Sequence, residues 1–346
     1  MPKCYKFAVI WRQNKIILLI LPSQQKFCIM EFRTSLKLRE TRGALCHSDG
    51  IMMLGSCFSD NIGARLRSAM MRVDINPFGT IFNPMSVAAS IKRIITGTPI
   101  AGMELFKANG VWNSYAFHSR FSKSDKMVAL EKMNQRISEA HRHLKEAKAL
   151  IITLGTAMVY RLKATGEVVG NCHKVPQHEF LRGMAGISET VDEMSEAMEM
   201  LLRFNPGIRV IFTVSPIRHI ADGLETNSLS KATLRCAVDA IIARYPQCEY
   251  FPSYEIMLDD LRDYRFYAAD MIHPSDVAIE YIWQQFQATY FDDHTAQAVA
   301  RCERVSKRLQ HRPMSDNREV VERFRADTDT VVKNLLKEYP YLEGII

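Results

Sequence analysis

Residues 51–63 read IMMLGSCFSDNIG, and the rest of the chain is organised around this stretch. Four apolar residues end at Gly55, and two small residues with nucleophilic side chains follow as Ser56 and Cys57. Asp60 is then the predicted N-cap of a helix. The pattern is typical of a strand-to-helix turn that carries a nucleophile, because the free N–H groups of a first helical turn can face a developing negative charge. The alternative is an ordinary connection with a small buried cysteine.

Four further apolar runs follow the first one and alternate with amphipathic helices. The predicted strands are 51–54, 73–75, 149–155, 208–214 and 248–251, and the predicted helices fill most of 60–70, 83–95, 125–144, 194–202, 228–244 and 275–290. This alternation predicts an α/β fold, a three-layer arrangement with a mainly parallel five-stranded sheet flanked by helices. Residues 112–119 and 168–178 are expected to be irregular connections. In such sheets ligands bind beyond the carboxyl ends of the strands.

The two ends of the chain differ from this central part. Residues 1–29 carry an apolar octet between Lys15 and Pro22, but no small-residue cleavage site follows it, so we favour a disordered extension or a misassigned start over a secretion signal. Residues 30–292 form the predicted α/β domain. Residues 293–346 contain two charged amphipathic helices separated near Pro313, and we expect a C-terminal helical appendage there.

Composition narrows the function classes. The formal net charge is +7, but residues 1–29 contain five basic residues and no acidic one, which leaves +2 for the other 317 residues. A nearly neutral domain does not favour a nucleic-acid partner. Eight cysteines without a CxxC pair argue against a zinc ribbon or a disulfide scaffold and indicate a reducing, cytoplasmic location. No apolar run approaches the roughly 18 residues that span a bilayer, so no membrane partner is expected.

A second candidate motif lies more than two hundred residues after Cys57. Asp270 and His273 are three residues apart in a loop, and Pro274 follows them at a predicted helix start. A carboxylate at this spacing can accept a hydrogen bond from Nδ1 of the imidazole and leave Nε2 free as a base. The alternative is a surface Asp–His pair with no catalytic role. Together with Cys57 or Ser56, the motif predicts a nucleophile–His–Asp site.

Residues 30–290 resemble the GSCFA family, which is grouped with the SGNH/GDSL hydrolases. The segments that carry the resemblance are the GSCFS motif at 55–59, NPFGTIFNP at 76–84, LGT at 154–156, GNCHK at 170–174, TVSPIRH at 213–219 and the long run 250–274 that ends in DMIHP. The resemblance implies an SGNH hydrolase-like, flavodoxin-like sheet. It also implies an ester hydrolase or acyltransferase that acts on a small-molecule or carbohydrate ester.

The family motifs assign roles to individual residues. The first SGNH block places the nucleophile at Cys57, with Ser56 as the other candidate, and a histidine partner would lower the pKa of the thiol. The second block places an oxyanion glycine at Gly79. The third block lacks its usual asparagine, so Asn76 or Asn171 are the alternatives for that donor. The last block matches Asp270 and His273.

Three more residues are candidates for substrate binding: Arg218, His219 and His118. Arg218 at a strand end could hold a carboxylate or phosphate. We expect no cofactor and no metal, because Cys172, His173 and His178 are a poor ligand set. The alternative to an enzyme is a non-catalytic ligand-binding module on the same fold, which the missing third-block asparagine favours. The substrate, the acyl group and the oligomeric state stay open.

Overall fold

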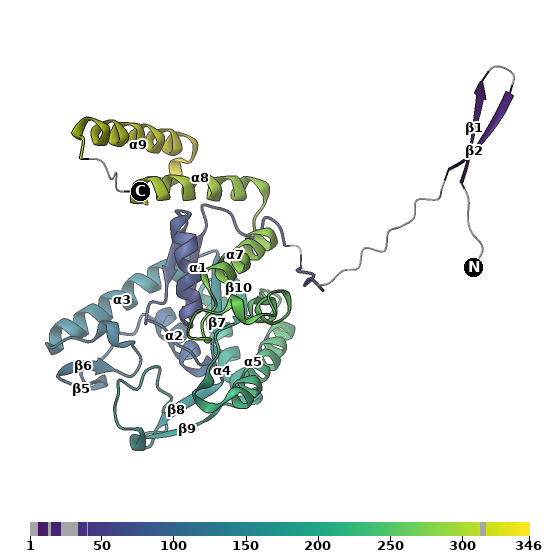
Figure 1. Ribbon diagram of the computed structural model, residues 1–346. Coiled ribbons are helices and arrows are strands. Elements are labelled where there is room, and N and C mark those ends of the chain that lie inside the picture. The colour runs from purple at the N-terminus through teal and green to yellow at the C-terminus, as the bar shows by residue number, and fades with distance from the viewer. Residues whose placement is uncertain (1–5, 13–14, 22–33, 40, 312–315) are drawn as a thin grey trace, which may run out of the picture. The chain divides into compact units, whose positions relative to one another are not determined.

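The structure is a computed structural model that describes residues 6–12, 15–21, 34–39, 41–311 and 316–346 (Figure 1). The chain divides into two compact units, residues 1–35 and 36–346. The first unit contains β1 (Lys6–Arg12) and β2 (Lys15–Leu21), an antiparallel pair. The remainder of the predicted 1–29 extension lies outside the described residues, and its proposed disorder or misassigned start stays a prediction.

The second unit is built on a five-stranded parallel sheet. Its order is β11 (Cys248–Tyr250), β10 (Arg209–Val214), β7 (Ala149–Leu154), β3 (Gly50–Gly55) and β4 (Arg72–Ile75). All four neighbouring pairs run parallel, and every residue of β3 and β7 is buried. Continuous apolar runs are typical of strands covered on both faces. The predicted five-stranded α/β sheet is therefore confirmed.

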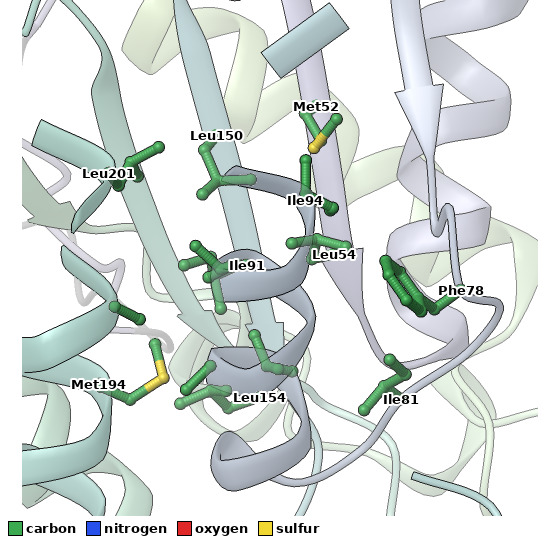
Figure 2. Packing of buried hydrophobic residues seen from close by; sticks show 14 of the residues in the cluster. Met52, Leu54, Phe78, Ile81, Ile91, Ile94, Leu150, Leu154, Met194 and Leu201 are labelled. Carbon is green, nitrogen blue, oxygen red and sulfur yellow. The ribbon is translucent and has the colours of Figure 1, made fainter. Parts of the chain in front are cut away.

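Helices cover both faces of this sheet. One face packs against α2 (Pro84–Thr96), α3 (Lys126–Glu146), α4 (Ile187–Phe204) and α5 (Leu224–Arg244). Successive strand residues point to opposite faces, so Met52 and Leu54 of β3 belong to this layer. Figure 2 shows these two side chains with Leu150 and Leu154 of β7 against Ile91 and Ile94 of α2 and Met194 and Leu201 of α4.

The opposite face packs against α1 (Cys57–Ser68) and α7 (Asp276–Tyr290). Ile51 and Met53 of β3 point into this layer, together with Trp283 of α7. Between β11 and α7 lie the short α6 (Ser253–Glu255) and a π-helical turn (Ile256–Asp260). The resulting three-layer arrangement places both α1 and the loop before α7 at the carboxyl edge of the sheet (Figure 1).

Two small antiparallel hairpins were not predicted. They are β5 (Leu105–Ala108) with β6 (Val111–Ser114), and β8 (Met158–Leu162) with β9 (Phe180–Met184). Residues 112–119 are thus not wholly irregular as expected. Asn109 and Gly110 join β5 to β6 with φ of +52° and +79°, and an Asn-Gly pair in that conformation is a strong hairpin signal. The strands are only four or five residues long, too short for a clear alternation.

The chain ends in α8 (Asp293–Gln310) and α9 (Arg318–Glu338), the two helices expected there. They form a small apolar cluster with Met70 at the end of α1, which also contains Leu335 and Leu342. The boundary predicted between residues 292 and 293 stays a prediction. In the part of the chain that the structure describes, no helix combines the length and apolarity needed to cross a membrane.

Candidate active site

The turn after β3 depends on Gly55. Its φ is +139°, and a Cβ at this position would lie 2.1 Å from the carbonyl oxygen of Thr153 on the neighbouring strand. Both the positive φ and this close contact exclude a side chain at position 55. The next residue, Ser56, donates its backbone N–H to the same Thr153 oxygen at 3.0 Å. Glycine therefore lets the chain press against β7 and turn at once into α1.

Helix α1 begins at Cys57, and its N-cap is Ser56, not the predicted Asp60. Ser56 is fully buried, and its Oγ accepts the backbone N–H of Phe58 at 3.3 Å. A serine oxygen at this position satisfies one of the unpaired donors of a helix start. Asp60 lies in the first turn instead, where it accepts hydrogen bonds from Asn76 and Thr80. Ser56 and Cys57 are adjacent, but only the Cys57 side chain is partly exposed.

Cys57, His273 and Asp270 lie together. The Sγ atom of Cys57 is 3.8 Å from Nε2 of His273, and Nδ1 of His273 is 2.6 Å from Oδ2 of Asp270. Asp270 also accepts the backbone N–H groups of Ile272 and His273 through its other oxygen, at 2.9 and 3.0 Å. The short loop thus orients the imidazole with one nitrogen held by the carboxylate and the other facing the thiol.

Electrostatics set the charge of these groups. The backbone N–H and the imidazole of His273, followed by the N–H of Ile272, lower the pKa of Asp270 to about 2, so it is ionised at any physiological pH. Burial raises the pKa of Cys57, and the nearby Asp60 adds to this rise. The N–H groups of Cys57 and Phe58 and the Lys231 ammonium act in the opposite direction, without overcoming burial. The thiol is therefore protonated at neutral pH.

The NPFGT turn packs beside the start of α1. Asn76 is fully buried with φ of +46°, its Oδ1 accepts the N–H of Gly55, and its Nδ2 donates to Asp60. Gly79 donates its N–H to the Asn76 carbonyl at 2.7 Å. A Cβ on Gly79 would lie 2.2 Å from Cβ of His118, which explains the glycine. Both predicted oxyanion donors in this turn, Asn76 and Gly79, are therefore committed to internal hydrogen bonds.

The loop after β7 takes the place of the third SGNH block. The N–H groups of Gly155 and Thr156 both donate to the carbonyl oxygen of Phe82. Oγ of Ser230, on α5, accepts the N–H of Ala157 at 2.7 Å. No residue of this loop offers an amide side chain to the site. Backbone N–H groups therefore hold this loop, through the carbonyl of Phe82 on one side and through Ser230 of α5 on the other.

Lys231 is a residue that sequence reasoning missed. Its side chain is fully enclosed, and Nζ donates to the carbonyl oxygens of Gly155 and Ser215 at 2.6 Å each, at the ends of β7 and β10. Burial lowers the pKa of Lys231 to about 7. The sequence signal was a lysine on the buried stripe of α5, three residues before Leu234 and seven before Val238.

His219 lies on the same side of the site. Its Nε2 is buried without a hydrogen-bond partner and would lie 3.1 Å from a Cβ on Gly155, while its ring meets Phe82 edge-on. Burial, and then the positive charges of Lys231 and His273, lower the pKa of His219 to about 4. The imidazole is neutral at physiological pH. His118 lies apart from it, beside Gly79, and its Nδ1 accepts the N–H of Arg120.

A cavity of about 530 Å³ borders this group. Its lining includes three predicted residues, Asn171, Arg218 and His219, and also Ile272 from the catalytic loop. Asn76 and Gly79 do not line it. Of the two asparagines left open by the sequence, Asn171 is the one that lines this cavity; its Oδ1 accepts the backbone N–H of His173 at 2.8 Å. A larger cavity of about 670 Å³ lies over α2 and β6, and neither cavity is lined by Cys57, Asp270 or His273.

Among the described residues, no three His, Cys, Asp or Glu side chains are grouped to hold a metal ion. His173 of the Cys172–His173 pair is buried, and its Nε2 contacts the carbonyl oxygen of Ser114 at 2.8 Å. His178 is exposed and pairs with Glu179. The chemistry supported by the described residues is that of a thiol, an imidazole and a carboxylate.

Comparisons with known proteins find one family and several similar structures. The GSCFA family model matches residues 50–286. A carbohydrate esterase family 2 enzyme with a carbohydrate-binding domain from Corynascus thermopiles (Myceliophthora fergusii) is similar over 75% of this chain and 67% of its own, with 12% identity and a TM-score of 0.35. An acetyl xylan esterase from the rumen bacterium Butyrivibrio proteoclasticus is similar over 70% of this chain and 63% of its own, with 10% identity and a TM-score of 0.34. No curated protein matches the sequence.

Proposed function

The chain belongs to the GSCFA family, and from that premise we propose that it is a hydrolase or acyltransferase that cleaves esters or thioesters through Cys57. One observation carries the proposal. Sγ of Cys57 lies 3.8 Å from Nε2 of His273, whose Nδ1 lies 2.6 Å from Asp270. This is the sequence of contacts that a nucleophile, a general base and an orienting carboxylate require.

The reaction begins with a proton transfer, because the Cys57 thiol is protonated at rest. His273 donates Nδ1–H to the ionised Asp270, so Nε2 is free to accept the thiol proton. The thiolate attacks the acyl carbon, and the leaving alcohol or thiol takes the proton from His273. A water molecule or an acceptor alcohol, deprotonated in turn by His273, then attacks the thioester. The acyl group leaves Cys57, and the thiol regains its proton.

Two donors support the tetrahedral intermediate. The backbone N–H of Cys57 lies at the start of α1 and has no oxygen acceptor among the described residues, so it can face the oxyanion as the helix N-terminus does in other acyl-transfer sites. The Asn171 side chain lines the adjacent cavity and is our candidate for the second donor, in place of the missing third-block asparagine. Gly79 is not proposed for this role, because its N–H is already bound.

We assign the nucleophile to Cys57 and not to Ser56. Ser56 is fully buried, and its oxygen caps the helix, so an ester carbonyl has no path to it. An O-acylated carbohydrate is the substrate class to test first. The alternative, a ligand-binding module without chemistry, is favoured by the two committed donors Asn76 and Gly79, and the same experiment decides between them.

The test is turnover of 4-nitrophenyl acetate and of acetylated xylo-oligosaccharides by the full chain and three variants. Loss of a positioned general base typically costs about 10²- to 10⁴-fold, so we expect Cys57→Ala and His273→Ala to lose at least that much of kcat/KM. Ser56→Ala is the matched control at the neighbouring position: it removes a cap worth about 1 kcal/mol of stability but leaves the thiol in place. Equal rates in wild type, Cys57→Ala and His273→Ala would favour the binding module.

A further inference from the structure

The charge of the 530 Å³ cavity is not balanced. Two arginines line it, Arg182 and Arg218, and Asp222 is the single acid among its lining residues. Both guanidinium amino groups of Arg182 donate to the two oxygens of Asp222, which uses up that carboxylate. Arg218 has no carboxylate within 4.0 Å anywhere in the described parts of the chain. The cavity therefore keeps one uncompensated guanidinium.

Arg218 is held rigidly despite lacking an acidic partner. Its Cζ lies 5.1 Å from the ring centre of Tyr267 and 5.5 Å from that of Tyr264, and Nη1 donates to the Met271 carbonyl at 3.1 Å. Its backbone N–H also donates to Ile272 at 3.2 Å. A guanidinium has five N–H donors, so one carbonyl leaves most of them for a ligand. Ordering in advance reduces the entropy lost when a ligand binds.

The position of Arg218 relates it to the reaction. Met271 and Ile272, its two backbone partners, immediately precede His273 in the catalytic loop. Arg218 and Ile272 line the same cavity, and Ile272 is the chain neighbour of His273, whose Nε2 lies 3.8 Å from Sγ of Cys57. A ligand that contacts Arg218 in this cavity can therefore extend along Ile272 toward His273. Arginine suits planar or tetrahedral oxyanions because its fork can donate two parallel hydrogen bonds.

From this we infer that the substrate of the Cys57 site carries a compact oxyanion, a carboxylate or a phosphate, which Arg218 binds beside the scissile ester. The inference rests on the proposed ester chemistry and adds the substrate class to it. It makes Arg218 a specificity-determining residue. A neutral ester would leave the Arg218 guanidinium hydrated. An anionic ester would displace part of that water and form an ion pair with the guanidinium.

Matched ester pairs test this directly. 4-Acetoxybenzoate and its methyl ester differ in a charge on the alcohol side, and 4-nitrophenyl succinate and 4-nitrophenyl valerate differ in a charge on the acyl side. 4-Acetoxyphenyl phosphate tests the phosphate. We expect wild type to prefer the anionic member of at least one pair by roughly tenfold to a hundredfold in kcat/KM, the range of one hydrogen-bonded charge. Arg218→Gln should remove that preference, mainly through KM, because it lowers kcat/KM for the anionic member of each pair far more than for the neutral member.

Arg262→Gln is the charge-matched control, because Arg262 is exposed, pairs with Asp259 and does not line the cavity. It should keep the wild-type preference. If Arg218→Gln lowers neutral and anionic esters equally, Arg218 only supports the catalytic loop and the inference is wrong. It is also wrong if wild type shows no anion preference in any pair.

A binding measurement separates this inference from the proposed chemistry. In Cys57→Ala, benzoate and inorganic phosphate should raise the melting temperature, and Cys57→Ala combined with Arg218→Gln should lose that shift. If anions bind through Arg218 but no ester is hydrolysed, the proposed function fails and the anion site stands. If esters are hydrolysed but neither anion binds through Arg218, the proposed function stands and the anion site fails.

Discussion

Cys57 lies in surroundings that oppose a resting thiolate. The sequence led us to expect a histidine partner to lower its pKa, and that expectation is wrong, because burial and the Asp60 carboxylate together raise it. Desolvation penalises the charged form of any acid. The short contact with His273 then matters as a path for the proton and not as a standing ion pair. The thiol would be activated only when a substrate is present.

Alkylation by iodoacetamide over a range of pH measures this at the residue scale. A raised pKa means that less thiolate is present at a given pH, so we expect the labelling midpoint of Cys57 to lie above that of a free thiol. Exposed Cys236 is the internal reference in the same digest. The midpoint, read by peptide mass, is independent of the slower access to a half-buried sulfur. A Cys57 midpoint below neutral pH would show that the site holds a thiolate at rest.

Sequence spacing was sufficient to predict that Asp270, His273 and Cys57 lie together. Asp270 and His273 are three residues apart on one loop, so their contact could be inferred locally, and a glycine turn pointed to Cys57. The internal hydrogen bonds of Asn76 and Gly79 could not be inferred. These hydrogen bonds depend on the contact between two loops that follow different strands, and the sequence of neither loop predicts that contact.

At the scale of elements, helix α5 determines how the strand ends are held. Lys231 joins the carbonyl ends of β7 and β10, and Ser230 beside it binds Ala157. The five strands were predicted from apolar runs. The helices that cover them were predicted from apolar residues that recur at intervals of three and four. The β5–β6 and β8–β9 pairs were not predicted, because they lie outside the regular alternation of strand and helix that marked the equally short β4 and β11. Lys231 interrupts the apolar stripe of α5, and only its two carbonyl partners in the structure explain why a lysine lies there.

The depressed pKa of Lys231, about 7, predicts how stability depends on pH. Between that value and the ordinary lysine value the unfolded chain binds a proton that the folded chain has released, so stability rises with pH. We expect a gain on the order of 1 kcal/mol per pH unit from pH 7 to 10, measured by urea unfolding. Lys231→Met should lack the gain, whereas the exposed Lys145→Met should keep it. Buried Cys248 and Cys302, whose pKa values are raised, oppose the gain at the upper end of this range in both proteins, so the test is the difference between wild type and Lys231→Met. A difference that does not grow with pH would contradict the assignment.

For the molecule as a whole, the C-terminal helices are packed onto the α/β unit. Val299 of α8 joins the core layer of α1 and α7, and Trp283 donates to Glu303 at 3.4 Å. Tyr341 contacts Nδ1 of His47 at 3.0 Å, which links the last turn to the segment before β3. These contacts join residues far apart in sequence, so the amphipathic pattern predicted the helices but not the surface that each one covers.

Leu335 tests whether this packing contributes to the stability of the fold. It is 5% exposed within the cluster formed by α8, α9 and Met70. Replacing a buried leucine by alanine costs roughly 2–5 kcal/mol, and we expect the lower part of that range for Leu335→Ala near the surface. Val331→Ala on the exposed face of α9 should change the unfolding free energy by less than about 0.5 kcal/mol. Equal effects of the two substitutions on the urea midpoint would mean that α9 folds apart from the rest.

The acyl-enzyme tests the central claim most directly. Wild-type protein is mixed with 4-nitrophenyl acetate, quenched in acid within a turnover, and digested for peptide mass analysis of residues 51–65. We expect one acetyl group on Cys57, released by neutral hydroxylamine as a thioester is, absent from Cys57→Ala and formed far more slowly in His273→Ala. Acetylation of Ser56, or steady ester hydrolysis without any acetyl group on Cys57, would contradict a Cys57 nucleophile.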